Sequence, residues 1–446
     1  MGRWIFFHAC VVLVEMKSFL LALLLGGTVA APAGAQLRLP NLPTLPQLPT
    51  LPAALPRAVE NPLAVADLAG LRRATIDRLL QRYPAALERD PNGEPVVRGE
   101  LLAQPSREQL RGLIVAAGYT VVREQVLEGL DERWWIVRPP EGMALAEALA
   151  RLRGVDPAGH YDYQHVYTGS GEAGAPTAAS AATSTSPAPP SSARVGLIDA
   201  GIDAGHPALQ GVELHRHGCD EHAHPSPHGT AVASLLVGRG SAFRGALPAG
   251  ALWAADVYCD APTGGSVEAI ARALAWTARE RVAVVNISLV GPPNVLLERA
   301  VAALVRRGHL LVAAVGNDGP AAPPLYPAAW PGVVGVTGTD ARRRVLPEAG
   351  RGAQVMFAAP GADLAAAAPG DTRFAEVRGT SFAAPLVAGL LAERLAQPDP
   401  AAAALALGTL GQSAIDLGAP GRDPIYGLGL VGDALRIAPA TVARRR

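Results

Sequence analysis

The C-terminal half of the sequence presents a carboxylate, an imidazole and a hydroxyl in three separate motifs. Asp199 leaves an apolar run, His228 opens the small-residue stretch H-G-T-A-V-A-S, and Ser381 stands in R-G-T-S-F-A-A-P. A serine hydroxyl is a weak nucleophile at neutral pH, so it needs an imidazole to take its proton and a carboxylate to orient that imidazole. Each motif alone is also typical of an ordinary turn or helix start. Together the three indicate acyl transfer by a serine nucleophile.

The order Asp, His, Ser along the chain narrows the class of enzyme. The α/β-hydrolases use another order and a G-x-S-x-G turn, which this sequence lacks. The region from Arg194 onward resembles the subtilase family of serine peptidases in four motifs: D-A-G, H-G-T-A-V-A, A-V-G-N-D-G and G-T-S-F-A-A-P. The resemblance implies that Asp199, His228 and Ser381 form a catalytic triad. It also implies that Asn317, with the backbone N–H of Ser381, stabilises an oxyanion.

The resemblance extends to residues that would hold a peptide substrate. The predicted substrate-binding residues are Ser288, Leu289, Val290, Gly291, Ala314, Val315, Gly316 and Leu325. The segment S-L-V-G is similar to a family segment that pairs with an extended peptide as an added strand. Val290 and Leu325 stand where relatives have glycine, so they add bulk around the side chain that precedes the cleaved bond. We therefore expect a shallow S1 pocket that accepts small or medium side chains.

Two cysteines remain in the chain once the N-terminal leader described below is removed. In an exported protein, Cys219 and Cys259 are expected to form a disulfide rather than a redox site. A histidine cluster around the first of them, His215, His217, His222 and His224, offers metal-ligating side chains. The spacing of these histidines matches no standard structural zinc site. We therefore expect no bound metal here, and we expect the cluster to lie on a solvated loop.

No cofactor is predicted from the sequence. Many subtilases bind a structural calcium ion after the helix that carries the catalytic histidine. The corresponding loop, Gly238–Gly245, contains no Asn or Asp oxygen, and calcium prefers such ligands. A calcium ion is therefore not supported at this position.

Short apolar runs alternate with helical patterns throughout residues 194–440. The runs are Val195–Ile198, Leu252–Val257, Val282–Ile287, Leu310–Val315, Val333–Val336 and Val355–Ala359. Unbroken apolar strands separated by helices predict an α/β domain with a doubly wound, mostly parallel sheet. Ligands bind such sheets at the carboxyl ends of the strands, which is where Asp199 and Asn317 are expected.

A second, smaller domain is expected before the peptidase-like region. Residues 94–168 show the order βαββαβ, which predicts a small α+β ferredoxin-like sheet within a domain spanning residues 58–168. By its place it resembles a subtilase pro-domain, an intramolecular inhibitor removed on maturation. Residues 169–193, rich in Ser, Ala, Thr, Gly and Pro, are expected to form a flexible linker. The alternative is an accessory domain that is retained.

The N-terminus carries the features of a secretory leader. Lys17 is the only lysine among 39 basic residues. It precedes an apolar run that ends in A-x-A, which is typical of a signal peptide. The predicted leader covers residues 1–35, and translation is expected to start at Met16. An uncleaved anchor is the alternative. Residues 36–57 repeat Leu-Pro and predict an extended spacer. Secretion or a periplasmic location is therefore expected, with no membrane association after cleavage.

These observations predict an exported serine endopeptidase made as a zymogen, which acts on protein or peptide substrates through an acyl-enzyme. The net charge is +0, so nothing favours a nucleic-acid partner. With a lysine only in the leader, a Ser–Lys dyad is excluded from the mature chain. Two alternatives stay open: a catalytically silent binding protein with a subtilase fold, and a His-rich periplasmic metal-binding protein.

Overall fold

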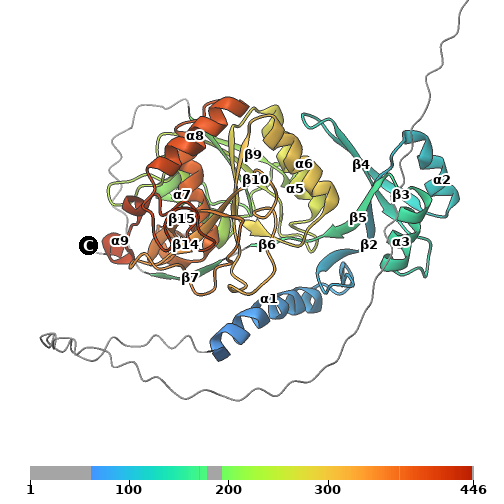
Figure 1. Ribbon diagram of the computed structural model, residues 1–446, viewed down its shortest axis with the longest axis horizontal. Coiled ribbons are helices and arrows are strands. Elements are labelled where there is room, and N and C mark those ends of the chain that lie inside the picture. The colour runs from blue at the N-terminus through green and yellow to red at the C-terminus, as the bar shows by residue number, and fades with distance from the viewer. Residues whose placement is uncertain (1–61, 170, 178–192, 371, 444–446) are drawn as a thin grey trace, which may run out of the picture. The chain divides into compact units, whose positions relative to one another are not determined.

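Seven strands form the central sheet of the computed structural model, which describes residues 62–169, 171–177, 193–370 and 372–443 (Figure 1). Every neighbouring pair in the sheet is parallel, in the order β15–β14–β13–β11–β8–β10–β9. The strands are β8 (Arg194–Asp199), β9 (Leu214–His217), β10 (Ala251–Asp256), β11 (Val284–Ile287), β13 (Leu310–Ala314), β14 (Val334–Thr339) and β15 (Val355–Pro360).

Helices cover both faces of this sheet. The long helices of this region are α4 (Pro227–Val237), α5 (Val267–Arg279), α6 (Val295–Arg306), α7 (Thr380–Ala392) and α8 (Pro400–Gln412), and α9 (Pro439–Ala443) is shorter. Side chains alternate along a strand, so Leu197 packs into the core that holds α4 and α7, whereas Ile198 packs into the core that holds α5 and α6. The predicted doubly wound α/β fold is confirmed.

Short elements complete this region. They are η2 (Pro207–Leu209), η3 (Cys219–Glu221), β12 (Leu289–Val290), β16 (Leu364–Ala367), β17 (Phe374–Arg378) and η4 (Asp433–Leu435). The predicted signal peptide, the Leu-Pro spacer and residues 178–192 of the predicted linker lie outside the described residues. Within the part of the chain that the structure describes, no helix combines the length and apolar character needed to cross a membrane.

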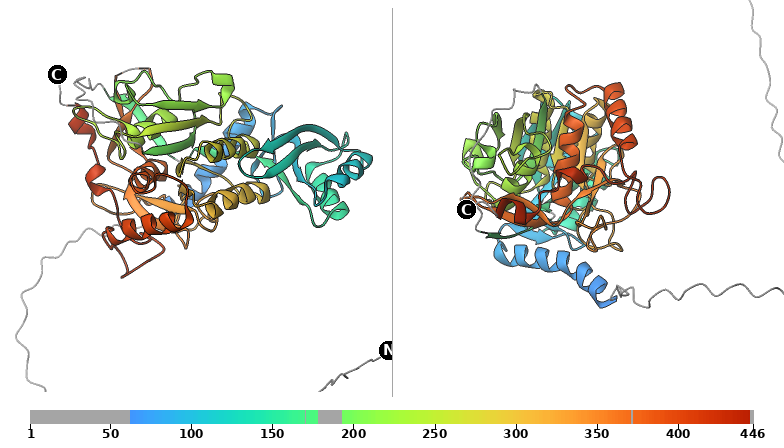
Figure 2. Two further views of the ribbon diagram at one scale, coloured as in Figure 1. Left: turned by 90° about the horizontal axis from the view of Figure 1, so that it is seen from above. Right: turned by 90° about the vertical axis from the view of Figure 1, so that its left-hand side faces the viewer.

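A second sheet lies on the α5 and α6 side (Figure 2). The region that forms this sheet and its helices contains α1 (Pro62–Arg82), β1 (Leu87–Arg89), β2 (Pro95–Gln104), η1 (Glu108–Leu110), α2 (Arg111–Ala116), β3 (Thr120–Leu127), β4 (Glu132–Arg138), α3 (Leu145–Val155) and β5 (His160–His165). The strands pair antiparallel in the order β5–β2–β4–β3, with β1 beside β2. This is the order that a βαββαβ fold requires.

Both faces of the second sheet are buried along the apolar run W-W-I-V of β4. Trp135 packs with α2 and α3 on one face, whereas its neighbour Trp134 packs into the core that holds α5 and α6. Because side chains alternate along a strand, one face of β4 packs on its own helices and the other packs on α5 and α6 of the peptidase-like region.

Two strands occupy a stretch that composition predicts to be linker. β6 (Thr168–Gly169) pairs antiparallel with β12, and β7 (Glu172–Thr177) pairs antiparallel with β17. The first residues of segment 169–193 are therefore not free linker. Composition describes side chains only, whereas these two strands form through backbone groups that pair with strands far along the chain.

Candidate active site

Asp199 and His228 meet at the carboxyl end of the parallel sheet. Asp199 is the last residue of β8 and only 2% exposed, and its Oδ1 lies 2.8 Å from Nδ1 of His228. The same oxygen accepts from the N–H of Ala200 at 2.7 Å, which fixes the carboxylate. Burial by itself lowers the pKa of His228, but the charge and hydrogen bond of Asp199 outweigh it, so that pKa lies above its ordinary value.

The first turn of α4 positions the histidine. Ser226 caps this helix by accepting from the N–H of His228 at 3.3 Å. A Cβ on Gly229 would lie 2.2 Å from the carbonyl oxygen of Ala200. Only glycine therefore allows α4 to begin directly against the loop that follows Asp199.

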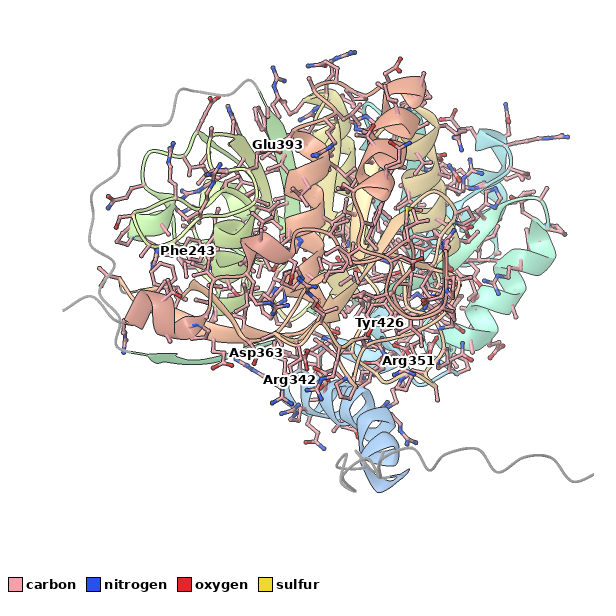
Figure 3. All side chains as sticks on the ribbon, turned by 60° about the vertical axis from the view of Figure 1, so that its left-hand side comes forward. Phe243, Arg342, Arg351, Asp363, Glu393 and Tyr426 are labelled. Atoms are coloured by element: carbon pink, nitrogen blue, oxygen red, sulfur yellow. A yellow bond between two sulfur atoms is a disulfide. The ribbon has the colours of Figure 1, made fainter. Side chains whose placement is uncertain are left out.

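Ser381 is the second residue of α7 and is fully buried. Its hydroxyl donates to the carbonyl of Ser288 at 3.3 Å, and the Ser288 hydroxyl donates to the carbonyl of Ser381 at 3.0 Å. The ring of Phe382 lies 5.3 Å from the His228 ring, measured between centroids, which brings the start of α7 next to the imidazole. Glu393, labelled in Figure 3, follows the other end of α7, so the helix N-terminus faces the site.

Thr380 connects this helix to the segment that carries Asn317. Its backbone N–H donates to Oδ1 of Asn317 at 3.1 Å, and its Oγ1 accepts from the N–H of Gly316 at 3.2 Å. Because the amide oxygen of Asn317 is held in this way, the orientation of its NH₂ group is fixed as well. Sequence reasoning missed this role of Thr380, although its place directly before Ser381 in the motif offers a signal.

The predicted substrate-binding residues lie along this side of the sheet. Ala314 ends β13, and Val315 and Gly316 follow it as buried residues. Leu325 is 8% exposed and packs on Gly316, where a Cβ would lie 2.6 Å from its Cδ1. The side chain of Leu325 thus packs on the segment that precedes Asn317.

β12 receives the chain's own segment at the edge of the site. Leu289 pairs with Gly169 and Val290 pairs with Thr168 in antiparallel register. A Cβ on Gly169 would lie 3.7 Å from Nε2 of His228. The segment that follows the second sheet therefore runs across the imidazole and continues as β7 beside β17.

The histidine cluster does not converge on one point. His215 and His217 lie on β9 and stack on Trp253 and Trp276, with ring centroids 4.2 Å and 5.0 Å apart. Among the described residues, the one group of three ligand-type side chains whose donor atoms gather within 4.8 Å consists of Cys219, Asp256 and Cys259. The predicted solvated loop is wrong for His215 and His217, because these residues lie on the edge strand β9.

The predicted disulfide is confirmed. Cys219 and Cys259 are bonded across a sequence separation of 40 residues. Their sulfurs are therefore not metal ligands, and the bond ties η3 to the loop after β10.

A family model described as the subtilase family matches residues 191–429. Subtilisin Savinase of Lederbergia lenta is 35% identical over 207 residues, which cover 45% of this chain and 76% of that protein. Minor extracellular protease Epr of Bacillus subtilis (strain 168) is 33% identical over 208 residues, covering 46% of this chain and 32% of Epr.

Among solved structures, fervidolysin of Fervidobacterium pennivorans, described as a keratinolytic enzyme related to subtilisin, superimposes with a TM-score of 0.63. At 19% identity the similarity concerns the fold, and it covers 81% of this chain and 62% of fervidolysin. The chain thus spans less than two thirds of the length of both Epr and fervidolysin.

Proposed function

Because the chain belongs to the subtilase family, we propose that it is a serine endopeptidase with Asp199, His228 and Ser381 as its triad. The observation that carries this proposal is the 2.8 Å contact between Asp199 and His228 at the carboxyl end of β8, beside the first turn of α7, which contains Ser381. All three groups are held by buried backbone elements, which suits a preorganised site.

The reaction follows from these positions. Ser381 Oγ attacks the peptide carbonyl carbon while Nε2 of His228 takes the hydroxyl proton, and Asp199 stabilises the imidazolium. The carbonyl oxygen becomes an oxyanion that accepts from the amide of Asn317 and from the N–H of Ser381 at the positive end of α7. The C–N bond then breaks and His228 gives its proton to the leaving amine. Water hydrolyses the acyl-enzyme by the same steps, with His228 again as base.

Substrates bind in an extended form along β12, as residues 168 and 169 do within the chain. Each pair contributes backbone hydrogen bonds that do not depend on sequence. Leu325 fills space beside Gly316, so the side chain before the cleaved bond is small or medium. No cofactor takes part, since each step uses groups of the chain and water.

Residues 62–169 act as a pro-region that inhibits the enzyme before maturation. Asp162 accepts from the N–H of Val295 at 2.8 Å, and Gln164 accepts from the N–H of Glu268 at 3.1 Å. These bonds satisfy otherwise unpaired donors at the first turns of α6 and α5. Arg123 adds an ion pair of 2.8 Å to Glu268 of α5, and a pair of 2.7 Å with Glu100 of its own sheet holds the guanidinium in place. With the tail across His228, these contacts support an intramolecular complex.

Maturation breaks the chain beside its own active site. Gly169 lies against His228, and a Cβ on Gly171 would lie 2.7 Å from the ring of Phe382, which follows Ser381. The first cut therefore falls at one of the two peptide bonds of Ser170. The product would begin at residue 170 or 171, and the precursor would be exported through its N-terminal leader before this cut.

Active-site labelling with a fluorophosphonate tests the proposal. The wild-type protein and its Ser381→Ala variant are compared by labelling, by a casein gel and by N-terminal sequencing. We expect label, casein hydrolysis and a new N-terminus at residue 170 or 171 in wild type only. A processed wild type that takes no label would favour a silent binding protein. Identical processing of both proteins would show that maturation is not autocatalytic.

A further inference from the structure

Pro385 interrupts the regular hydrogen bonding of α7 close to Ser381. In an α-helix each carbonyl accepts from the N–H of the fourth residue along the chain, and Pro385 is the fourth residue after Ser381. Proline has no N–H, so the backbone carbonyl of Ser381 cannot accept this helical bond. Both residues are buried, and a buried carbonyl needs a donor. Another part of the chain must therefore serve this carbonyl.

The hydroxyl of Ser288 supplies such a donor. Ser288 directly follows β11, and its hydroxyl donates to the carbonyl oxygen of Ser381 at 3.0 Å. A serine hydroxyl carries one proton, so this bond commits it, and the oxygen of Ser288 can then act only as an acceptor. It accepts from the side-chain NH₂ group of Asn286 at 2.8 Å. Asn286 thus determines the direction in which the hydroxyl of Ser288 points.

Asn286 lies on a strand that is otherwise apolar. β11 has the sequence V-V-N-I, and it is buried along its whole length between β8 and β13. Oδ1 of Asn286 is buried without a hydrogen-bond partner among the described residues. Burying an unsatisfied polar atom lowers stability, so an apolar side chain would suit this strand better for folding alone. The asparagine therefore indicates a role in the site rather than in the core.

The same bonds join Ser381 to the strand that receives the substrate. Ser381 Oγ donates to the backbone carbonyl of Ser288 at 3.3 Å, so the two serines are bonded in both directions. β12 begins at the next residue and pairs with the chain's own residues 168 and 169. A change in the orientation of the Ser288 hydroxyl would therefore move Ser381 relative to the peptide that it attacks.

We propose that Asn286 is a positioning residue for the peptidase reaction. It acts through the hydroxyl of Ser288, which holds the first turn of α7 and so keeps Ser381 Oγ aimed at a peptide bound along β12. This inference rests on the proposed function, because it takes Ser381 as the nucleophile. Asn286 is fully buried and does not meet the substrate, so its loss should lower kcat and leave KM close to the wild-type value.

A double-mutant cycle tests this path. Asn286→Ala, Ser288→Ala and the double variant are allowed to mature and are assayed with a quenched fluorescent peptide that has the sequence of residues 166–177. The amount of fluorophosphonate bound at completion gives the concentration of active enzyme, so unfolded protein is not counted. We expect kcat of Asn286→Ala to fall about tenfold to a hundredfold, with KM close to the wild-type value.

The double variant should be no slower than Ser288→Ala, because Asn286 has no hydroxyl to orient once that serine is replaced. Losses in kcat that multiply in the double variant would overturn the inference, since Asn286 would then act by a path that does not include Ser288. A wild-type kcat in Asn286→Ala would also overturn it.

Asn286→Leu separates positioning from folding. Leucine fills a similar volume and removes the unsatisfied amide oxygen, so this variant should keep the urea midpoint of its parent, measured with Ser381→Ala in both proteins. Its kcat, measured with Ser381 intact, should nevertheless fall as in Asn286→Ala. A wild-type kcat, or a lost kcat together with a lower urea midpoint, would overturn the inference.

Thr337→Val is the matched control. Thr337 lies on the central strand β14 and is fully buried, and its Oγ1 has no hydrogen-bond partner within the part of the chain that the structure describes. The substitution thus removes a buried polar atom without breaking a bond in the site, so kcat and KM should both stay at their wild-type values.

The proposed function can fail separately from this inference. Wild-type protein that takes no label and cuts no peptide would overturn the proposed function, and the inference with it. Labelled wild-type enzyme whose kcat is matched by Asn286→Ala and Asn286→Leu would overturn the inference alone.

Discussion

Gly169 lies against the imidazole of His228, so that a Cβ on this glycine would be 3.7 Å from Nε2. This spacing is an ordinary van der Waals distance for one methyl group, but a longer side chain would extend into the ring or be turned away from it. The chain therefore presents bare backbone at the point where His228 must exchange protons with a reacting group.

Enlarging Gly169 should slow maturation. In Gly169→Leu the added side chain meets the imidazole and displaces the adjacent peptide bond from Ser381. A displacement of about 1 Å costs on the order of 10²-fold in rate. The conversion of full-length to mature protein, followed on gels after refolding, measures this effect.

The control is Gly154→Leu in α3. Gly154 is exposed and would meet no atom within 4 Å, so processing should proceed at the wild-type rate. If Gly169→Leu also matured normally, residue 169 would not be near the catalytic imidazole during cleavage.

Shortening Leu325 should widen substrate preference. Leu325→Gly removes a side chain that packs on Gly316 and frees volume beside the residue before the cleaved bond. Burying a phenylalanine there is worth about 1.5–3 kcal/mol, so kcat/KM for peptides with phenylalanine before the cut should rise about tenfold to a hundredfold relative to alanine. Leu405→Gly, at a side chain 71% exposed on α8, should leave that ratio unchanged.

The central strands could be predicted because they are apolar on both faces. β13 is fully buried along Leu310–Ala314, and a strand of this kind is visible as an unbroken apolar run. β9 lacks this signal. It is an edge strand of four exposed or half-buried residues whose histidines stack on Trp253 and Trp276. These aromatic partners are distant in the sequence, so the local pattern does not show the strand.

The candidate site divides in the same way. The residue types and order of Asp199, His228 and Ser381 are visible in the sequence, and so are the cysteines that pair. The contacts of Thr380 with Asn317 and the burial of Tyr167 depend on segments that meet only in three dimensions. Composition suggested a free linker after Thr168, because antiparallel pairing by backbone groups leaves little trace in side-chain type.

Removing the disulfide should destabilise the peptidase region. A cross-link with a sequence separation of 40 residues restricts the unfolded chain and contributes about 4 kcal/mol in the chain-entropy treatment. The double variant Cys219→Ser/Cys259→Ser should therefore unfold at lower urea concentration than its parent. Both proteins carry Ser381→Ala, which prevents self-digestion. An unchanged midpoint, with an unchanged m-value, would contradict a stabilising role for the bond.

The pH dependence of activity should report the pairing of Asp199 with His228. His228 must be neutral to accept the proton of Ser381, so kcat/KM rises with pH through its pKa. Asp199 holds that pKa above its ordinary value, which places the acidic limb of the wild-type profile above about pH 6.5. In Asp199→Asn, burial still lowers the pKa of His228, but the carboxylate charge that raises it is lost. The acidic limb of the profile should therefore move to lower pH.

The same substitution should lower the plateau of kcat by about 10³–10⁴-fold, because the amide no longer fixes the tautomer or stabilises the imidazolium. The comparison is Asp399→Asn, where the side chain caps α8 and asparagine caps equally well, so limb and plateau should both stay as in wild type. Profiles measured with one peptide from pH 5 to pH 9 distinguish the two effects. A limb that stays in place in Asp199→Asn would mean that the carboxylate does not set the pKa of His228, whatever happens to the plateau.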